Sequence, residues 1–229
     1  MRAGAVGATM GRVSTLNGRQ IAEHGLDGWA FLVGGLQTRI ETGSFAAGLA
    51  LVDAIGAEAE RAQHHPDVDL RYPHVDVRLT SHDVGGVSDR DVAMARAIAD
   101  LAQSAGHRLD ATAVSLVEMG LDTPDRTVVM PFWAAVLAYE APGGDADDEV
   151  RDPAGAGPTV WFQPSGSEEP RQRWHPDVWV DPSQVEPRIE AALAAGGSLV
   201  SDAEAPSFWV LADPEGNRVC LCTWQDRES

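Results

Sequence analysis

The stretch "ERAQHHPDVDLRYPHVDVRLTSHDVGGVSDRD", residues 60–91, holds four of the seven histidines in this chain of 229 residues. In its middle, Val75, Val77 and Leu79 alternate with polar residues, which predicts a strand with one buried face. The "VDLRY" before it predicts the partner strand of a hairpin. The stretch therefore runs from the end of one helix, through a hairpin, to the start of the next helix.

Helices are predicted on both sides of this hairpin. Ser44 is placed to cap the helix "FAAGLALVDAIGAEAERAQ", and Pro66 is placed to end it. Ser88 begins the following helix with Asp91 three residues on as a capping box, and Gly106 closes it. The face of the first helix that we expect to be buried carries Phe45, Leu49, Val52 and Ile55.

An earlier hairpin is predicted in "GWAFLVGGLQTRIET", with its turn at Gly34-Gly35. Together with a short helix from Ser14 to about His24, this gives the order α-β-β-α-β-β-α. We expect one antiparallel sheet with helices on one face, over residues 14–107. Residues 1–13 are rich in small residues, and we interpret them as a flexible tail and not as a signal peptide.

The second half, residues 110–229, predicts two β-α-β-β modules after a short link at "GHRLD". The first module runs from strand "TAVSLVEMGL" through a helix and an acidic, glycine-rich loop to strand "TVWFQP". The second runs from strand "RWHPDVWVDP" through helix "VEPRIEAALAAGG" to the hairpin "SFWVLADPEGNRVCLCTW". The fold class expected for the whole chain is α+β with two domains.

Charge divides the two halves and limits the partners. The net charge is -18, the chain has no lysine, and all 17 basic residues are arginine. The chain up to Arg108 contains 10 arginines and 13 acidic residues. The chain after it contains 7 arginines and 22 acidic residues. Because nucleic acid requires a basic face, we expect no nucleic-acid partner. The absence of lysine excludes Schiff-base chemistry on this chain's own side chains.

Cysteine usage and hydropathy favour a cytoplasmic protein. Cys220 and Cys222 are two apart in an alternating run, a spacing that is poor for a mutual disulfide. No apolar run approaches the roughly 20 residues of a membrane span, so we expect no membrane partner. A cytoplasmic location therefore remains the expectation.

Three histidines of the opening stretch are candidates for proton transfer. On a helix that runs on to Pro66, Glu60 lies one turn before His64, on the same face. If the strand after the hairpin pairs beside the end of this helix, His64, His65 and His82 could converge, with Glu60 and Asp91 behind them. Imidazoles titrate near neutral pH, which suits proton transfer in both directions.

Other interpretations of the same residues stay open. A histidine pair at the C-terminus of a helix often only complements the helix dipole, and Asp91 is explained by capping. Three histidines could also bind zinc. However, adjacent histidines point apart, unlike the i, i+4 spacing of helical zinc ligands, so no metal is predicted here.

The stretch resembles the signature of the pterin-4a-carbinolamine dehydratases. That pattern is an acidic residue, three residues, His-His-Pro, an aromatic residue, a later histidine and an aspartate. This chain fills the positions with Glu60, His64, His65, Pro66, Tyr72, His82 and Asp91. One departure is Val68, where an aromatic residue is frequent in the family.

The resemblance implies a lyase that removes water from a 4a-hydroxytetrahydropterin and needs neither a metal nor an organic cofactor. It implies His64 and His82 as the acid/base pair, with His65 mainly holding the pterin. The residues that would bind or orient are Glu60, Pro66, Tyr72, Ser81 and Asp91. It further implies a homodimer or homotetramer, and a pterin-dependent hydroxylase as partner.

The second half resembles the glyoxalase/bleomycin-resistance group in "WHPDVWVD", "AAGGSLV" and "WVLADPEGNRVCL". Metal-binding members place His or Glu at four strand positions. Only His175 matches, because residues 112–113, Gln163 and Cys220 stand at the others. We therefore predict no metal in this half and a pocket-lining role for His175. Six of the seven tryptophans lie here, some placed to line a pocket for a flat ring.

Two rival interpretations remain. In one, the first half is a non-catalytic pterin-binding, dimerisation or regulatory module, although three placed imidazoles argue against a pure scaffold. In the other, the second half is the main enzyme or a binding protein for an unknown small molecule. A tightly bound divalent metal would favour that second interpretation.

Overall fold

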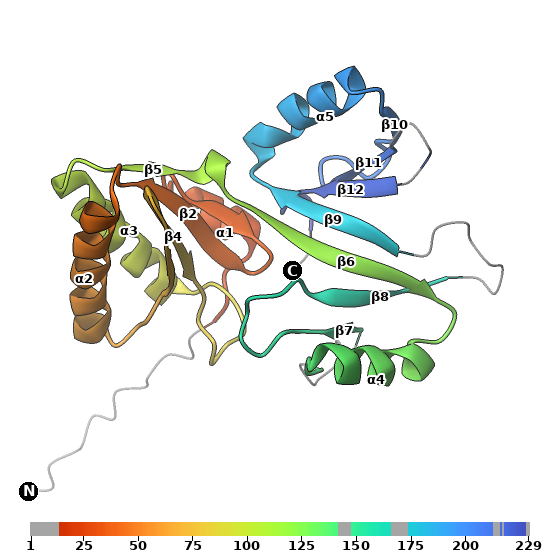
Figure 1. Cartoon of the computed structure of the whole chain (residues 1–229), viewed down its shortest axis with the longest axis horizontal. Coiled ribbons are helices and arrows are strands. Elements are labelled where there is room, and N and C mark those ends of the chain that lie inside the picture. Colours follow the sequence, from red (N-terminus) through yellow and green to blue (C-terminus); the bar gives the residue numbers. More distant parts are fainter. Residues whose placement is uncertain (1–13, 142–147, 166–173, 213–215, 217, 228–229) are drawn as a thin grey trace, which may run out of the picture.

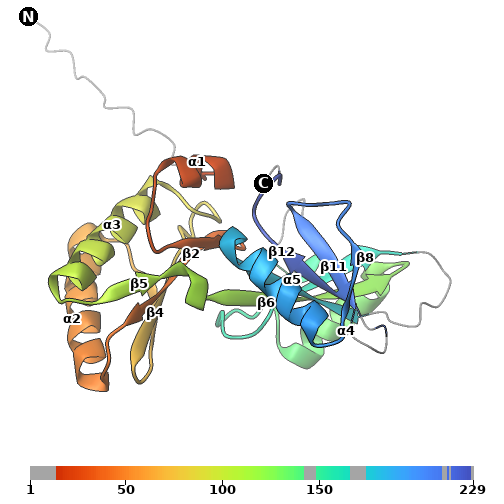
Figure 2. The ribbon, with the colours of Figure 1, turned by 90° about the horizontal axis from the view of Figure 1, so that it is seen from above.

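The computed structural model describes residues 14–141, 148–165, 174–212, 216 and 218–227. It contains two sheets in two lobes that lie side by side, an N-terminal lobe (residues 14–110) and a C-terminal lobe (residues 111–227) (Figures 1 and 2). The predicted α+β class is confirmed. The expected tail at residues 1–13 lies outside the described residues, and the predicted domain boundaries stay predictions.

The N-terminal lobe follows the predicted order and adds one strand. Its sheet has the order β1-β2-β4-β3, with every pair antiparallel. An additional short strand, β5, pairs with the part of β2 beyond β1, where a link was expected. The elements are α1 (Gly18–Glu23), β1 (Ala30–Leu32), β2 (Gly35–Glu41), α2 (Phe45–Ala62), β3 (Asp67–Leu70), β4 (His74–Leu79), α3 (Asp89–Ser104) and β5 (Arg108–Asp110).

The core of this lobe lies between the sheet and the two long helices. Val77 of β4, Ile55 of α2 and Ile98 of α3 belong to one buried cluster. Figure 1 shows α2 and α3 on the same side of the sheet. The turn between β1 and β2 falls one residue earlier than predicted, since Val33 and Gly34 have φ of 42° and 67°. These are the left-handed angles of a two-residue hairpin turn.

Helix α2 begins as predicted and ends earlier. The Ser44 side chain accepts a hydrogen bond from the Ala47 backbone, as an N-cap does. The helix stops at Ala62, before Pro66 is reached, because Gln63 turns left-handed with φ 51°. The His64 N–H then donates to the Ala59 carbonyl at 3.1 Å, a bond that closes the helix end.

The predicted buried face of α2 is partly wrong. Ile55 is buried, but Phe45 is 51% exposed and Leu49 is 53% exposed. Gly48 and Leu51 face the core in their place. A Cβ at position 48 would lie 2.6 Å from the end of the Leu70 side chain, so the helix packs closely on the hairpin at this glycine.

The C-terminal lobe is a seven-stranded sheet with the order β10-β11-β12-β9-β6-β8-β7. The two modules meet where β6 and β9 pair antiparallel. Each central strand has a parallel neighbour from its own module, β8 beside β6 and β12 beside β9. The elements are η1 (Ala111–Ala113), β6 (Ser115–Thr123), α4 (Arg126–Leu137), β7 (Glu149–Val150), β8 (Val160–Pro164), β9 (Trp174–Val180), η2 (Pro182–Gln184), α5 (Val185–Ala194), β10 (Ser198–Ser201), β11 (Phe208–Ala212) and β12 (Arg218–Cys222).

The predicted paired modules are confirmed, with two short strands added. Neither β7 nor β10 was expected. The "DPEGN" turn lies largely outside the described residues. Strand β6, the first of this lobe, also begins later than predicted, because residues 111–113 form a 3-10 helix. None of the helices in the described part of the chain is long and apolar enough to span a bilayer.

The two lobes touch and enclose a common cavity. Ala30 and Leu32 of β1 pack with Val114 and with Trp179 of β9. Beside this contact lies a cavity of about 2340 Å³. Its walls come from both sheets and include Arg78, His82, Glu118, Trp161, His175 and Cys220.

Candidate functional sites in the two lobes

Asp91 is the centre of the polar network in the N-terminal lobe. It lies in the first turn of α3, where it completes the predicted capping box with Ser88. Its side chain is fully buried. A helix N-terminus favours a carboxylate because the free backbone N–H groups point toward it. The sequence therefore buries this charge at a position where the backbone can stabilise it.

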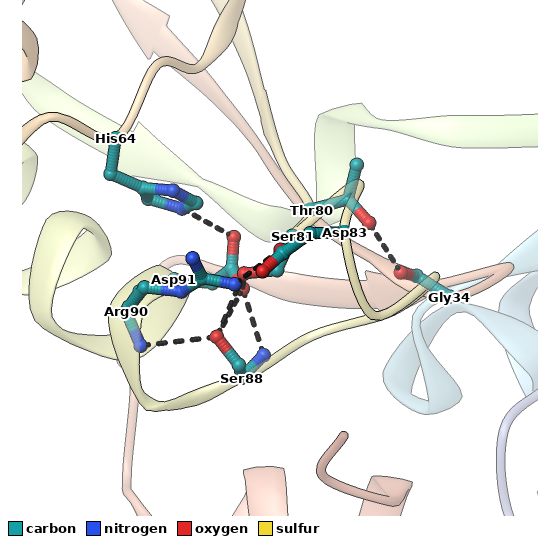
Figure 3. Close-up of polar contacts among 8 residues, drawn as sticks. All are labelled: Gly34, His64, Thr80, Ser81, Asp83, Ser88, Arg90 and Asp91. Atoms are coloured by element: carbon teal, nitrogen blue, oxygen red, sulfur yellow. Dashed lines mark hydrogen bonds and ion pairs between the residues drawn. The ribbon is translucent and has the colours of Figure 1, made fainter. Parts of the chain in front are cut away.

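Hydrogen bonds occupy both oxygens of Asp91 (Figure 3). Oδ2 accepts from the Ser81 hydroxyl at 2.6 Å and from the Ser88 backbone N–H at 2.8 Å. Oδ1 lies 2.7 Å from Nε2 of His64. The hydroxyls of Ser81 and Ser88 also form a hydrogen bond with each other, with 2.7 Å between the two oxygens. Buried donors around both oxygens fix the carboxylate in one orientation.

The contact with Asp91 assigns the tautomer of His64. An ionised carboxylate only accepts hydrogen bonds, so Nε2 of the imidazole is the donor. The second nitrogen, Nδ1, is then the one that can exchange a proton with another molecule. The His64 side chain is 11% exposed. A buried carboxylate beside an imidazole orients the ring and fixes which nitrogen carries the proton.

His65 and Glu60 form a separate, exposed pair. His65 Nε2 lies 3.2 Å from a Glu60 carboxylate oxygen, and the two side chains are 58% and 74% exposed. The expected partnership of Glu60 with His64 is therefore wrong. It assumed a helix that continues to Pro66, whereas the left-handed turn at Gln63 takes His64 out of the helical register.

His82 stands on the cavity wall. It is exposed and has no hydrogen-bond partner among the described residues. His64 is not part of that wall. Of the other predicted binding residues, Pro66 is half-buried and Tyr72 is 71% exposed. The structure thus joins His64, Ser81 and Asp91 by hydrogen bonds and leaves the remaining candidates near solvent.

Three residues around this network were not on the sequence-based list of site residues. Ser88 contacts both Asp91 and Ser81, and its N-cap position was the signal for it. Arg90 forms an ion pair with Asp83 and holds the pKa of that carboxyl below its usual value. Asp83 follows His82 in the sequence, and Arg90 lies in the first turn of α3, so the pair ties the loop after β4 to this helix.

The C-terminal lobe contributes a second polar cluster, His175, Asp177 and Cys220. Burial raises the pKa of the Asp177 carboxyl, while the nearby His175 opposes that rise. Burial and the neighbouring Asp177 raise the pKa of the Cys220 thiol to about 12. The Trp161 ring stands edge-on to the His175 ring, with centroids 5.5 Å apart. The pocket-lining position predicted for His175 agrees with this location.

Glu118 lines the same cavity, and the pKa of its carboxyl is strongly raised. It is buried in β6 and accepts a hydrogen bond from the Trp179 indole at 2.7 Å. Burial raises the pKa of its carboxyl to about 7, and the indole opposes the rise. Sequence reasoning did not single out Glu118, because one acidic residue in a strand carries no signal of burial.

Comparison with known proteins agrees with this division. Residues 14–101 match the family model of pterin 4 alpha carbinolamine dehydratase, and residues 118–222 match that of a glyoxalase-like domain. A protein of Mycobacterium tuberculosis, provisionally named a pterin-4-alpha-carbinolamine dehydratase, is 40% identical over 77 residues, which are 34% of this chain and 82% of the relative. The chain belongs to the pterin-4a-carbinolamine dehydratase family.

Further members of the family show the same partial coverage. A similarly named protein of Nocardia farcinica is 45% identical over 28% of this chain and 67% of its own length. A crystal structure titled transcriptional coactivator/pterin dehydratase from Brucella melitensis is 27% identical, covers 39% of this chain and 99% of that one, and has a TM-score of 0.38. The match to the dehydratase family model ends at residue 101, before the C-terminal lobe.

Proposed function

We propose that the N-terminal lobe dehydrates a 4a-hydroxytetrahydropterin. The reaction breaks the C4a–OH bond, removes a proton from the ring nitrogen and releases water, which gives the quinonoid dihydropterin. It requires one group that accepts a proton and one that donates a proton. Family membership supports the reaction class, and the side chains of this lobe supply both groups without a cofactor.

The observation that carries the proposal is the contact between His64 and the buried Asp91. Because Nε2 is bonded to the carboxylate, Nδ1 is the nitrogen left to take or give a proton at the substrate. Ser81 and Ser88 hold the carboxylate from its other side. This arrangement favours His64 as a group that changes protonation state while its ring stays in place.

His82 is the second proton-transfer group in the proposal. Its imidazole has no partner among the described residues and faces the cavity, so it is accessible to a substrate. His65 would hold the pterin, with Glu60 orienting His65. Pro66 and Tyr72 would border the pterin ring. A pterin-dependent hydroxylase that supplies the substrate, and a homodimer or homotetramer, belong to the same proposal.

The test is the rate of loss of a 4a-hydroxytetrahydropterin compared with its spontaneous dehydration. We expect acceleration by the wild-type chain and a loss of about 10²–10⁴-fold in His64→Ala and in His82→Ala. His74→Ala is the matched control, because His74 lies on β4 of the same hairpin and outside the family pattern. A folded wild type without acceleration would leave a pterin-binding or regulatory module.

A further inference from the structure

Arg78 lies on the wall of the cavity between the two lobes and forms no ion pair with any residue that the structure describes. Its Nε is buried and has no hydrogen-bond partner there either. Six other arginines do pair with carboxylates, as an excess of 35 acidic residues over 17 arginines predicts. Because a buried N–H without an acceptor is costly, this guanidinium points to an acceptor that a ligand supplies.

Gln37 adds a second unpaired donor beside Arg78. The two residues are direct partners across β2 and β4, so their side chains project from one face with Cβ atoms about 4.5–5.5 Å apart. The amide nitrogen of Gln37 is also buried, again without a hydrogen-bond partner in the described part of the chain. Both side chains line the cavity. An amide next to a guanidinium forms a group of donors that suits the oxygens of one anion.

The C-terminal lobe covers the face of the sheet that carries these two donors. Val77, next to Arg78 on β4, points the other way into the core beneath the helices. Ala30, which pairs with Gln37, packs against Val114 of the C-terminal lobe. The donors therefore lie between the lobes, where a ligand in the cavity can reach them.

Arg78 is turned away from the carboxylate across the sheet. Asp67 of the edge strand β3 is its direct partner in the register, yet within the described residues no ion pair joins the two. The Arg78 side chain leans toward β2 instead, since a Cβ at Gly35 would lie 2.9 Å from its Nε. Glycine at position 35 thus leaves room for the guanidinium, and the charge is held toward the cavity.

The same wall carries His82, the second proton-transfer group of the proposed dehydratase. Arg78, Thr80 and His82 are alternate residues along the chain, and all three line the cavity. A strand rises about 3.3 Å per residue, so at most about 13–14 Å separates the Cα atoms of Arg78 and His82. Trp161 and Trp179 of the C-terminal lobe line the cavity as well and offer faces for a flat ring. A pterin at His82 can therefore extend its substituent toward Arg78.

We propose that Arg78 and Gln37 bind an oxyanion, a carboxylate or a phosphate, on the ring substituent of the pterin substrate. This inference rests on the dehydratase function proposed above and narrows its substrate to pterins with an acidic substituent. The planar fork of an arginine matches two oxygens of either group. Arg78 was not among the sequence-based site residues, because an arginine in an alternating strand usually marks a solvent-facing position.

The other charges of the cavity favour an oxyanion that is attached to a ring over a free ion. Carboxylates line several sides of the cavity, those of Asp67 and Asp148 among them, and they repel anions in general. Arg78 and Gln37 therefore have to act together with contacts to the ring. Inorganic phosphate should not compete with an acidic pterin at equal concentration.

Binding of three fluorescent pterins to the full-length chain tests the proposal. They differ in the substituent on C6: 6-hydroxymethylpterin is neutral, whereas its phosphate monoester and pterin-6-carboxylate are acidic. Fluorescence titration gives a Kd for each. The variants are Arg78→Gln, which removes the charge, and Gln37→Leu, which removes the amide. Arg71→Gln is the control, because Arg71 belongs to the same hairpin, is 67% exposed and pairs with Asp69.

We expect the wild type to bind at least one acidic pterin more tightly than the neutral one by about tenfold or more, as for hydrogen bonds to charged groups. Arg78→Gln should abolish this preference, Gln37→Leu should reduce it and Arg71→Gln should keep it. The acid that binds more tightly identifies the group as a carboxylate or a phosphate. Equal binding of all three pterins by the wild type, no binding, or an undiminished preference in Arg78→Gln overturns the proposal. Should Arg78→Gln fail to fold, a preference that survives intact in Gln37→Leu overturns it.

The dehydration assay separates this inference from the dehydratase itself. If the wild type accelerates dehydration but binds the three pterins equally, the dehydratase stands and the oxyanion site is overturned. If the wild type shows the preference without acceleration, the oxyanion site stands and the dehydratase is overturned.

Discussion

Two buried aspartates, one in each lobe, differ in how their charge is satisfied. Asp91 is fully buried, and its two oxygens bond to His64, Ser81 and Ser88. Asp177 is 8% exposed, and burial raises the pKa of its carboxyl although His175, the Cys220 thiol and the Trp161 indole oppose that rise. Asp91 lies at a helix N-terminus, where backbone N–H groups are available. Asp177 lies within a sheet, whose backbone groups are already paired.

The difference separates a carboxylate held by a helix N-terminus and two hydroxyls from one held only by side chains of its own sheet. The Asp91 network needs no further component to be stable, and it leaves one histidine nitrogen for chemistry. In the Asp177 cluster the neighbouring groups only partly oppose the effect of burial on the carboxyl. Stability measurements can therefore distinguish the two sites, and four predictions follow in order of decreasing effect.

The largest effect is expected from Asp91→Ala. Removing this carboxylate leaves the Ser81 hydroxyl, the Ser88 backbone N–H and His64 without their acceptor. We expect a loss of about 3–5 kcal/mol in the free energy of unfolding, as for other broken buried pairs. Denaturant unfolding measures it. Asp89→Ala is the control, because its side chain is 88% exposed in the same helical turn. Equal losses in the two variants would contradict the assignment.

Glu118→Gln should change the pH dependence of stability. Burial raises the pKa of Glu118 to about 7 from an ordinary value of 4.5. The folded state therefore binds this proton more tightly, and the stability gained from it is full below pH 4.5 and lost as pH rises to 7. The wild type should lose at most about 3 kcal/mol from this group across that window.

The glutamine variant should not show this loss, since it stays neutral and keeps an oxygen for the Trp179 indole. Denaturant unfolding of both proteins at pH 5 and pH 8 measures the difference. Parallel pH profiles would mean that Glu118 is not held in an apolar environment.

Gly120→Ala tests how closely the cavity wall is packed. The new Cβ would meet the His175 ring, so we expect a loss of about 1–3 kcal/mol in unfolding free energy. Gly56→Ala is the matched control on α2. Apart from the adjacent residues and the nearby backbone of α2 itself, no heavy atom lies within 4 Å of a Cβ there, and alanine should raise stability by about 0.5–1 kcal/mol. Thermal unfolding of the two variants should move in opposite directions.

The smallest effect is expected from Glu60→Gln. Glu60 and His65 are both exposed, and such ion pairs contribute about 0–1 kcal/mol. We expect the urea midpoint to change by less than its experimental error. If the dehydration rate nevertheless falls while stability holds, Glu60 acts on the substrate through His65. A large loss of stability would instead place Glu60 in the fold's core interactions.

Much of the fold followed from local patterns. Alternation in β4, the capping box at Ser88 and Asp91, and the pairing of the two C-terminal modules were all predicted and found. The predictions were wrong where a single residue decided the local structure. Gln63 carries no signal for a left-handed turn, yet it ends α2 early and separates His64 from Glu60. The exposed Phe45 was misplaced because apolarity alone does not say which face of a helix meets the sheet.

The sequence by itself determined the two-part α+β architecture, the net charge of -18 and the list of histidines, because these depend on composition and on short-range spacing. Only the tertiary structure decided which side chains meet. Asp91 contacts His64, which lies 27 positions earlier in the sequence. Cys220 pairs with Asp177, which lies 43 positions earlier. Contacts at such separations depend on strand register and helix packing, which the whole chain sets together.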